Sequence, residues 1–308
     1  PHIKNVSHMA NTLKVLDCSG KICGIDQNGI SNLKHIESLN CDNNTRILDV
    51  NHLKDTLKIL NCANSCKIDQ NGISQLNLKI LNCSQNQNIK NLNHMANSLE
   101  ELICCYCYGI EDKGLHNLKL SKLNCSYGKK IEYIPNFVNT LEELICRGSS
   151  VSQHMIDFLV RLKKLDCSFN SHINCLSHIS NTLEELICKG NDNGINQNEI
   201  DKLKIIKKLD CSDNQNIYKL NHLCETLEEL HCEGSSKINQ KSILQLKYIR
   251  ILNCNGNSGI YDITQFSDTL IESDHLQFCK TKNPMTFKLL SSISDFFFDV
   301  FCRYIDNS

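Results

Sequence analysis

The chain has 308 residues, of which 41% are hydrophobic and 22% are charged, the proportions of an ordinary globular protein. Its formal net charge of -1 argues against a polybasic nucleic-acid binder and provides no bulk attraction to an anionic membrane. The sequence contains no apolar run of about 18 residues, which excludes a membrane-spanning helix, and no charged-then-apolar signal segment at its start. The unusual feature is a content of 20 Cys with no Trp.

Twelve of the cysteines recur at intervals of 21 to 23 residues. Each one ends the same phrase, in which two apolar residues three positions apart precede the cysteine by two, as in Leu99, Leu102 and Cys104. The last step of the phrase alternates as a strand does, so Leu102 and Cys104 should share a face. Self-similarity at this period predicts a solenoid. The twelve are Cys18, Cys41, Cys62, Cys83, Cys104, Cys125, Cys146, Cys167, Cys188, Cys211, Cys232 and Cys254.

Over roughly residues 3 to 276 these units resemble leucine-rich repeats, whose phrase is L-x-x-L-x-L-x-x-N, with Cys at the third apolar position. The resemblance implies an α/β solenoid, a right-handed horseshoe or arc of about 13 turns with a parallel sheet on its concave side. Other copies depart from the phrase with Gly128, Ser149 and Ser235 at the turn, where another group must satisfy the backbone. The turn asparagine of the family corresponds to Asn44, Asn86, Asn170, Asn191, Asn214 and Asn257.

A second period of about 42 residues is superimposed on the first. After alternate strands comes a segment such as 195–203, which resembles the helical backs of the repeats in F-box leucine-rich proteins, and after the others a tighter segment such as 217–227. We therefore expect helical and tighter convex backs to alternate. The array should cover residues 1–279 and begin in mid-repeat, with N-terminal sequence missing. Residues 280–308, with Phe and other apolar residues at helical spacing, should form a C-terminal capping helix, an oligomer contact or a membrane-surface helix.

The cysteine row is predicted to pack in the core and to form neither disulfides nor a zinc site. Parallel side chains on strands ~4.8 Å apart do not converge as a disulfide requires, and a line cannot supply a tetrahedral zinc site. Buried free thiols are typical of a reducing compartment, so we expect a cytoplasmic protein. The local group Cys104, Cys105 and Cys107 should point to opposed faces, which disfavours a shared metal. No cofactor is predicted.

Histidines recur at one position of the repeat on alternate turns. Neighbouring copies are therefore about 10 Å apart, too far for one metal ion to be bound by both. Repeat duplication is the preferred explanation for His8, His52, His94, His178 and His222. The sequence lacks catalytic motifs such as G-x-S-x-G and H-E-x-x-H, so an enzyme is not expected.

Residues beside the buried Leu and Cys should point from the concave sheet. One row alternates in charge along seven turns: Glu101, Lys122, Glu143, Lys164, Glu185, Lys208 and Glu229. A second alternates likewise: Glu142, Lys163, Glu184, Lys207, Glu228 and Arg250. Opposite charges on adjacent strands attract one another, so both rows can be explained as surface that maintains the strand register.

The third row is polar except for Ile103, Ile145 and Ile187 on alternate turns, and aromatic residues with Arg147 follow these strands. Isoleucine, arginine and aromatic side chains together on a solvent face are typical of interface hot spots, although scattered surface apolar residues would give the same pattern. The candidate partner-binding residues are Glu101, Ile103, Tyr106, Lys122, Tyr127, Glu143, Ile145, Arg147, Lys164, Phe169, Glu185 and Ile187.

The sequence thus predicts a non-catalytic protein–protein interaction module that binds a protein on its concave face, with neither nucleic acid nor membrane as partner. Two alternatives stay open: the substrate-receptor part of an F-box-type ubiquitin-ligase adaptor, and a structural repeat protein that self-associates through Phe297, Phe301 and Tyr304 of its C-terminal aromatic helix. The composition, rich in Lys, Asn and Ile, resembles leucine-rich repeat proteins of amoeba-infecting giant DNA viruses, which would place the chain in a host cytoplasm.

Overall fold

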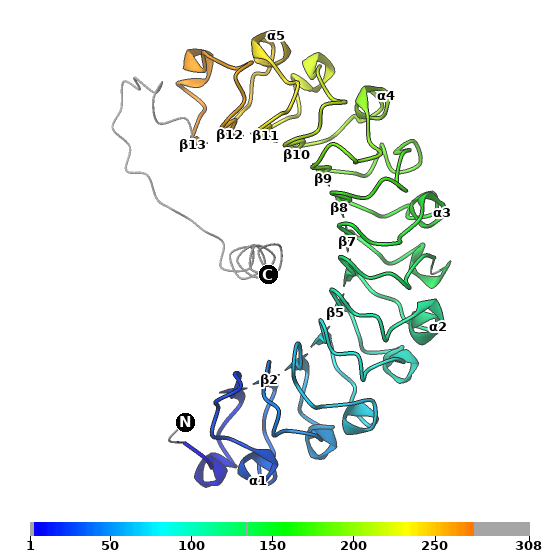
Figure 1. Cartoon of the computed structure of the whole chain (residues 1–308), viewed down its shortest axis with the longest axis vertical. Helices are drawn as coiled ribbons and strands as arrows, with labels where there is room; N and C mark the ends of the chain where they lie inside the picture. The colour runs from blue at the N-terminus through cyan, green and yellow to red at the C-terminus, as the bar shows by residue number, and fades with distance from the viewer. Residues whose placement is uncertain (1–2, 134, 274–308) are drawn as a thin grey trace.

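The computed structural model describes residues 3–133 and 135–273, and in these ranges the chain winds into an arc (Figure 1). Thirteen short strands form one parallel sheet in sequence order along the inner side of the arc. The strands are β1 (Val15–Asp17), β2 (Ser38–Asn40), β3 (Ile59–Asn61), β4 (Ile80–Asn82), β5 (Glu101–Ile103), β6 (Lys122–Asn124), β7 (Glu143–Ile145), β8 (Lys164–Asp166), β9 (Glu185–Ile187), β10 (Lys208–Asp210), β11 (Glu229–His231), β12 (Ile251–Asn253) and β13 (Glu272–Ser273). The predicted parallel solenoid of about 13 turns is confirmed.

Each strand pairs with the next without any shift in register. Leu102 lies opposite Leu123, which lies opposite Leu144, and the same holds for the residues on either side. A position in the repeat therefore becomes a column of side chains that runs along the arc. In β1 to β12 the central leucine points into the core with the cysteine two residues later, and the flanking residues point into the groove.

The outer side of the arc carries short helices, and the predicted alternation of two kinds of back is largely confirmed (Figure 1). The α-helices are α1 (Gln27–Ile30), α2 (Asp112–Leu115), α3 (Gln153–Ile156), α4 (Gln197–Ile200) and α5 (Gln240–Ile243). The 3-10 helices are η1 (Ser7–Met9), η2 (Asn51–Leu53), η3 (Asn71–Ile73), η4 (Asn93–Met95), η5 (Pro135–Phe137), η6 (Asn221–Leu223) and η7 (Thr264–Phe266). The helical backs are a single turn long, and η3 is a 3-10 helix where an α-helix was expected.

The recurring cysteines are free thiols buried between successive layers of leucine and isoleucine. In some copies the thiol donates to the carbonyl of the next strand, as Cys41 does to Asn61 O at 3.2 Å and Cys146 does to Asp166 O at 3.4 Å. Burial raises the pKa of the Cys211 thiol to about 12. The prediction that this row packs as small apolar side chains is confirmed for the part of the chain that the structure describes.

An asparagine ladder closes the turns that follow the strands. In the copy at Asn214, the side-chain amide donates to Cys188 O at 3.0 Å and to Ile195 O at 3.2 Å, and its oxygen accepts from Asn216 N at 2.9 Å. The assignment of Asn191 to this ladder from the sequence was wrong. Because the turn after Cys188 is two residues longer, Asn193 and not Asn191 fills the slot and donates to Cys167 O at 2.6 Å.

Two extra cysteines occupy the same slot as the asparagines. The thiol of Cys66 lies 3.8 Å from that of Cys41, and Cys107 donates to Asn86 O at 3.4 Å. A hydrogen bond from Cys83, assisted by backbone N–H groups, lowers the pKa of Cys107 to about 7 despite its burial. These cysteines are a second way to satisfy the turn backbone.

A glutamine at the start of alternate helices bridges to the next turn. The carboxamide oxygen of Gln197 accepts from Tyr218 N and Lys219 N, both at 2.9 Å, and its nitrogen donates to Lys219 O at 2.8 Å. Gln27, Gln70, Gln153 and Gln240 repeat this arrangement. The duplicated histidines link the same pairs of turns in the opposite direction.

Three of these histidine rings contact a backbone carbonyl at the end of the helix in the preceding turn. His52, His94 and His222 meet Ile30 O, Ile73 O and Ile200 O at 2.9 to 3.1 Å. In these three copies the histidine therefore has a structural role, which agrees with repeat duplication. The predicted capping helix at 280–308, like residues 274–279, lies outside the described residues.

Thiol labelling tests the cysteine layer. With iodoacetamide at neutral pH, Cys23, Cys175 and Cys224 should react in the native protein, because they are half-buried, and the buried ladder should react only after denaturation. Peptide mass spectrometry after a short pulse measures this. Native-state modification of Cys146 or Cys188 at the rate of Cys224 would contradict the packing described above.

A second prediction concerns the glutamine bridges. Substitution of Gln197 by Ala leaves three backbone groups of the next turn without their partner and should lower the free energy of unfolding by about 1–3 kcal/mol. Asn198→Ala, an exposed change one residue away, is the matched control. Urea denaturation of both variants measures the difference, and equal midpoints would show that the bridge does not stabilise the array.

Candidate functional site

The inner face of the sheet is a long shallow groove that runs from Asp17 on β1 to His231 on β11. Ten of the twelve predicted partner-binding residues line it: Glu101, Ile103, Tyr106, Lys122, Glu143, Ile145, Arg147, Lys164, Glu185 and Ile187. The other two, Tyr127 and Phe169, lie beside it on the turns that follow β6 and β8. In-register pairing thus brings the predicted set together over five consecutive turns.

The charged row on the first position of each strand is internally paired. Lys164 contacts Glu143 at 3.4 Å and Glu185 at 3.1 Å, and Lys122 contacts Glu143 at 3.6 Å. Contacts with these carboxylates raise the pKa of Lys164, although its partial burial acts in the opposite direction. The charges in the middle of the groove therefore neutralise one another, as the sequence predicted.

The neighbouring row pairs in the same way along the edge of the sheet. Lys163 and Lys207 contact Glu142 and Glu184 at 2.9 and 2.7 Å. Both carboxylates are solvent-exposed at their rims, so each pair contributes little to stability and mainly removes net charge from this edge. The row also extends toward the N-terminus through Lys79 and Glu100, at 3.4 Å.

The polar members of the third row are engaged by their own backbone. Asp166 is fully buried and accepts from Ser168 N at 3.1 Å and from Ser168 Oγ at 2.7 Å. Asn82 and Asn124 bind Ser84 and Ser126 in the same way. These side chains shape the turn after the strand, so they offer a partner less hydrogen-bonding capacity than the sequence suggests.

Ile103, Ile145 and Ile187 alternate with those polar residues and make no such bond. They are half-buried, and so less exposed than their sequence positions suggested. Register places Ile145 between Asn124 and Asp166. The three side chains form separate apolar steps along the floor of the groove.

Two cation–carboxylate pairs close the groove on the side of the turns, and of their four members only Arg147 was among the binding residues predicted from the sequence. Arg147 Nε lies 2.5 Å from the buried Asp166 Oδ2, and Lys189 Nζ lies 2.8 Å from Asp210 Oδ2. Contact with Asp210 raises the pKa of Lys189 against the effect of burial. The sequence does contain a signal for these pairs. Each cation directly follows one ladder cysteine, and the carboxylate that it binds directly precedes the next ladder cysteine.

Aromatic residues stand on the rim beyond these pairs. The rings of Tyr106 and Tyr127 stack with centroids 4.6 Å apart and an interplanar angle of 11°. Phe169, two turns beyond Tyr127, is 53% exposed. The predicted association of aromatic side chains with the strands is therefore observed, and the structure adds that two of the rings are held in a fixed mutual orientation.

A polar cluster that the sequence analysis did not identify lies at the C-terminal end of the groove. His231 Nε2 lies 2.8 Å from Glu229 Oε1, and the amide of Asn253, which can present nitrogen or oxygen, lies 2.9 Å from Nδ1. Burial opposes protonation of His231, but the hydrogen bond to Glu229 and the charge of Asp210 outweigh it and raise its pKa. The same hydrogen bond, with Lys208, lowers the pKa of Glu229 to about 2.

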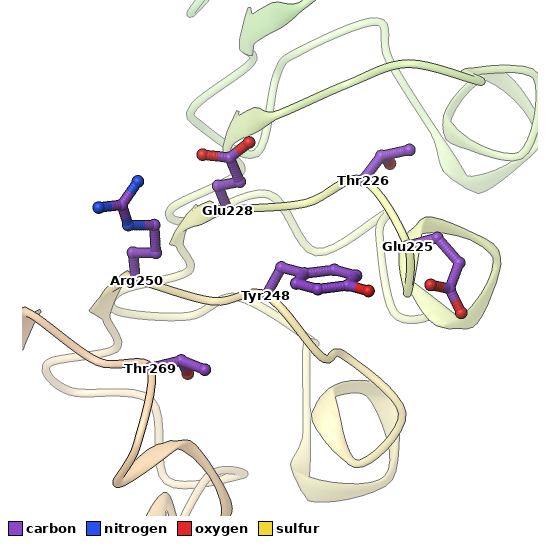
Figure 2. A pocket seen from close by; sticks show the side chains of 6 residues that line it. All are labelled: Glu225, Thr226, Glu228, Tyr248, Arg250 and Thr269. Carbon is purple, nitrogen blue, oxygen red and sulfur yellow. The ribbon is translucent and has the colours of Figure 1, made fainter.

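A smaller pocket lies on the opposite rim, before strands β11 and β12. Figure 2 shows its lining side chains, with Arg250 and Glu225 at opposite ends. Glu225 is bound by Lys247, and Thr226 contributes a buried hydroxyl without a partner. The side chains of Arg250 and Glu225 therefore do not meet in this pocket (Figure 2).

The described residues contain no group of three metal-ligating side chains that could hold an ion. None of the helices in residues 3–133 and 135–273 has the length and apolarity that crossing a bilayer requires.

Comparison with solved structures shows the same architecture in other proteins. The functional domain of InlJ from Listeria monocytogenes, which includes a cysteine ladder, matches over 87% of this chain and 64% of its own, with a TM-score of 0.58 and 23% identity. The leucine-rich repeat protein LIC12759 from Leptospira interrogans matches over 88% of this chain and 86% of its own, with a TM-score of 0.55 and 22% identity.

A third match is more distant. TLR13, solved in complex with single-stranded RNA, matches over 83% of this chain and 49% of its own, with a TM-score of 0.50 and 17% identity. No family model and no curated protein matches the sequence. The likenesses show the fold, a leucine-rich-repeat solenoid.

The His231 cluster generates a prediction on pH. A folded-state pKa above the ordinary 6.5 means that the charged pair stabilises the fold fully below about pH 6.5, and that this contribution is lost as pH rises through the raised value. The stability difference between wild type and His231→Asn should therefore shrink from about pH 6 to about pH 8. Chemical denaturation at several pH values measures it, with exposed His116→Asn as control. A difference that is independent of pH would show that the pair with Glu229 is not charged.

Proposed function

With a leucine-rich-repeat solenoid as the scaffold, we propose that this chain is a non-catalytic interaction module that binds a protein partner on its concave sheet face. The groove is preformed by an in-register sheet and spans most of the described turns, so binding would require little reorganisation. The predicted set of twelve residues supplies the contact surface, centred on β5 to β9.

The observation that carries this proposal is the contrast between neutralised charges and unengaged isoleucines in the middle of the groove. Lys122, Glu143, Lys164 and Glu185 form a paired row, while Ile145 and its equivalents remain half-exposed beside it. Apolar steps surrounded by paired charges resemble the core and rim of a protein–protein interface.

The same contrast argues for protein over nucleic acid. Phosphate recognition needs cations that are free to replace counterions, but Lys164, Lys189 and Arg147 are each committed to a carboxylate. The RNA bound in the TLR13 complex makes nucleic acid a useful comparison in the test.

More specific roles for this chain are each supported by fewer observations. A substrate receptor of an F-box-type adaptor is supported only by the alternating backs, and an F-box helix pair in the same protein would decide it. Self-association would depend on Phe297, Phe301 and Tyr304, outside the described residues. A cytoplasmic location, within a host if the chain is viral, is supported by the free buried thiols and by the composition.

The test replaces Ile103, Ile145 and Ile187 together by Asn, the residue that this column carries at Asn61, Asn82 and Asn124. Because the column already accepts Asn, the melting temperature should change little, while partner affinity should fall by about tenfold or more. Quantitative affinity capture from cell extract, followed by titration with the recovered partner, measures this.

The control is Ile205→Asp, an exposed position that does not line the groove. Equal capture by wild type, triple variant and control would reject the concave face as the binding surface. Capture of nucleic acid in place of protein would also contradict the proposal.

A further inference from the structure

One column of the repeat lies in the left-handed region of backbone space. It is the second residue after each ladder cysteine, where φ is between +51° and +97°. Most of its members are glycine or carry a short polar side chain, the residues that tolerate this conformation. The column is Gly20, Asn43, Asn64, Gln85, Tyr106, Tyr127, Gly148, Phe169, Gly190, Asp213, Gly234 and Gly256.

Three members are aromatic, which is unfavourable for the backbone. Tyr106, Tyr127 and Phe169 have φ values of 52°, 58° and 56°. A positive φ is an outlier for a bulky residue, and glycine or asparagine in the same column adopts it at lower cost. The stability of the fold alone does not favour these aromatic residues, so an advantage elsewhere is needed to explain them.

The neighbouring turns make room for the rings. A Cβ atom on Gly148 would lie 3.0 Å from two ring carbons of Tyr127, and one on Gly190 would lie 2.5 Å from two ring carbons of Phe169. Any residue other than glycine at 190 would therefore displace the ring. The order of the column is Tyr, Tyr, Gly, Phe, Gly, in which each glycine follows a ring that leans on it.

The result is a rim of oriented rings next to the groove. Tyr106 lines the groove and stacks on Tyr127, and Phe169 keeps 53% of its surface exposed. A ring held in one orientation loses little conformational entropy when it is covered, which is the property of a good binding anchor.

We propose that Tyr106, Tyr127 and Phe169, positioned by Gly148 and Gly190, anchor an uncharged peptide segment with aromatic side chains in the protein partner. This inference rests on the proposed function and specifies the chemistry of the partner. Aromatic side chains stack on aromatic faces and add to the energy of simple burial. The segment would run along the rim next to β5 to β9.

The surroundings favour an uncharged segment. Arg147 is bound to Asp166 and Lys189 to Asp210, and Lys129 Nζ donates to Gly148 O at 2.6 Å. A charged residue of the partner buried here would lose its hydration and find these groups already engaged by carboxylates or backbone. Apolar and aromatic residues incur no such penalty.

The experiment selects ligands from a random linear peptide library displayed on phage, with the full chain as bait. Enriched peptides should be uncharged and aromatic at their centre. The affinity of a selected peptide should fall about tenfold for Phe169→Asn and for Tyr127→Asn. Because asparagine holds the same backbone conformation at Asn43 and Asn64, both variants should melt at or above the wild-type temperature.

Tyr261→Asn, at an aromatic residue 66% exposed and outside the column, is the matched control and should bind as wild type. Failure of this inference is distinguishable from failure of the proposed function. Peptides that lose affinity with the Ile103, Ile145 and Ile187 triple variant but not with Phe169→Asn would overturn the rim as anchor and leave the groove as the binding face.

Three other outcomes would overturn the inference. These are enrichment of charged peptides, absence of any enrichment, and tighter binding of an oligouridine probe that depends on Phe169.

Discussion

In-register pairing of three-residue strands is the constraint from which the other features follow. Because Leu102, Leu123 and Leu144 lie directly opposite one another, a residue in the repeat always meets its own equivalent ~4.8 Å away. Identical residues in a column are favourable when they are apolar, as in the leucine and cysteine layers, but like charges would repel. Alternation of Lys and Glu is the solution in the charged columns, and alternation of rings with glycine is the solution on the rim.

The effective building unit is a pair of turns. Gln197 binds backbone groups of the following turn, and His222, on that turn, contacts the end of the helix that Gln197 begins. The turns after β1, β3, β7, β9 and β11 are therefore connected forward by a glutamine, and Asp112 takes this place after β5. A histidine connects back from the turns after β2, β4 and β10. This pairing of turns gives a structural reason for the 42-residue period. It also makes the stability of one turn depend on its neighbours, as expected for a solenoid.

Much of the fold could be predicted from the sequence because its apolar pattern is regular. Spacing of Leu and Cys identified the strands and the buried thiols, and the resemblance to leucine-rich repeats implied the parallel order of the strands. What escaped were side-chain bonds to backbone in another turn. Asn193 was missed because a longer turn moves the slot, and Gln197 because a polar residue on a helix face suggests solvent exposure. The bond of Arg147 to Asp166 was missed because the charge rows were followed straight along one column, while this pair is diagonal. The positive φ of Phe169 has no sequence signal apart from the glycines, Gly148 and Gly190, on either side of it in the same column.

The groove is chemically divided along its length, and this gives a reason why a partner would bind in one direction. In the first four turns the column that later carries Lys and Glu holds Val15, Ser38, Ile59 and Ile80, with Val15 and Ile59 exposed. There, apolar side chains lie beside the amides of Asn40 and Asn61, whereas in the central turns paired charges lie beside isoleucine. A segment bound along the groove would therefore meet a different order of surfaces in each of its two directions. With charge neutralised throughout the centre, orientation and specificity would come from where apolar side chains are placed, and less from long-range electrostatic attraction.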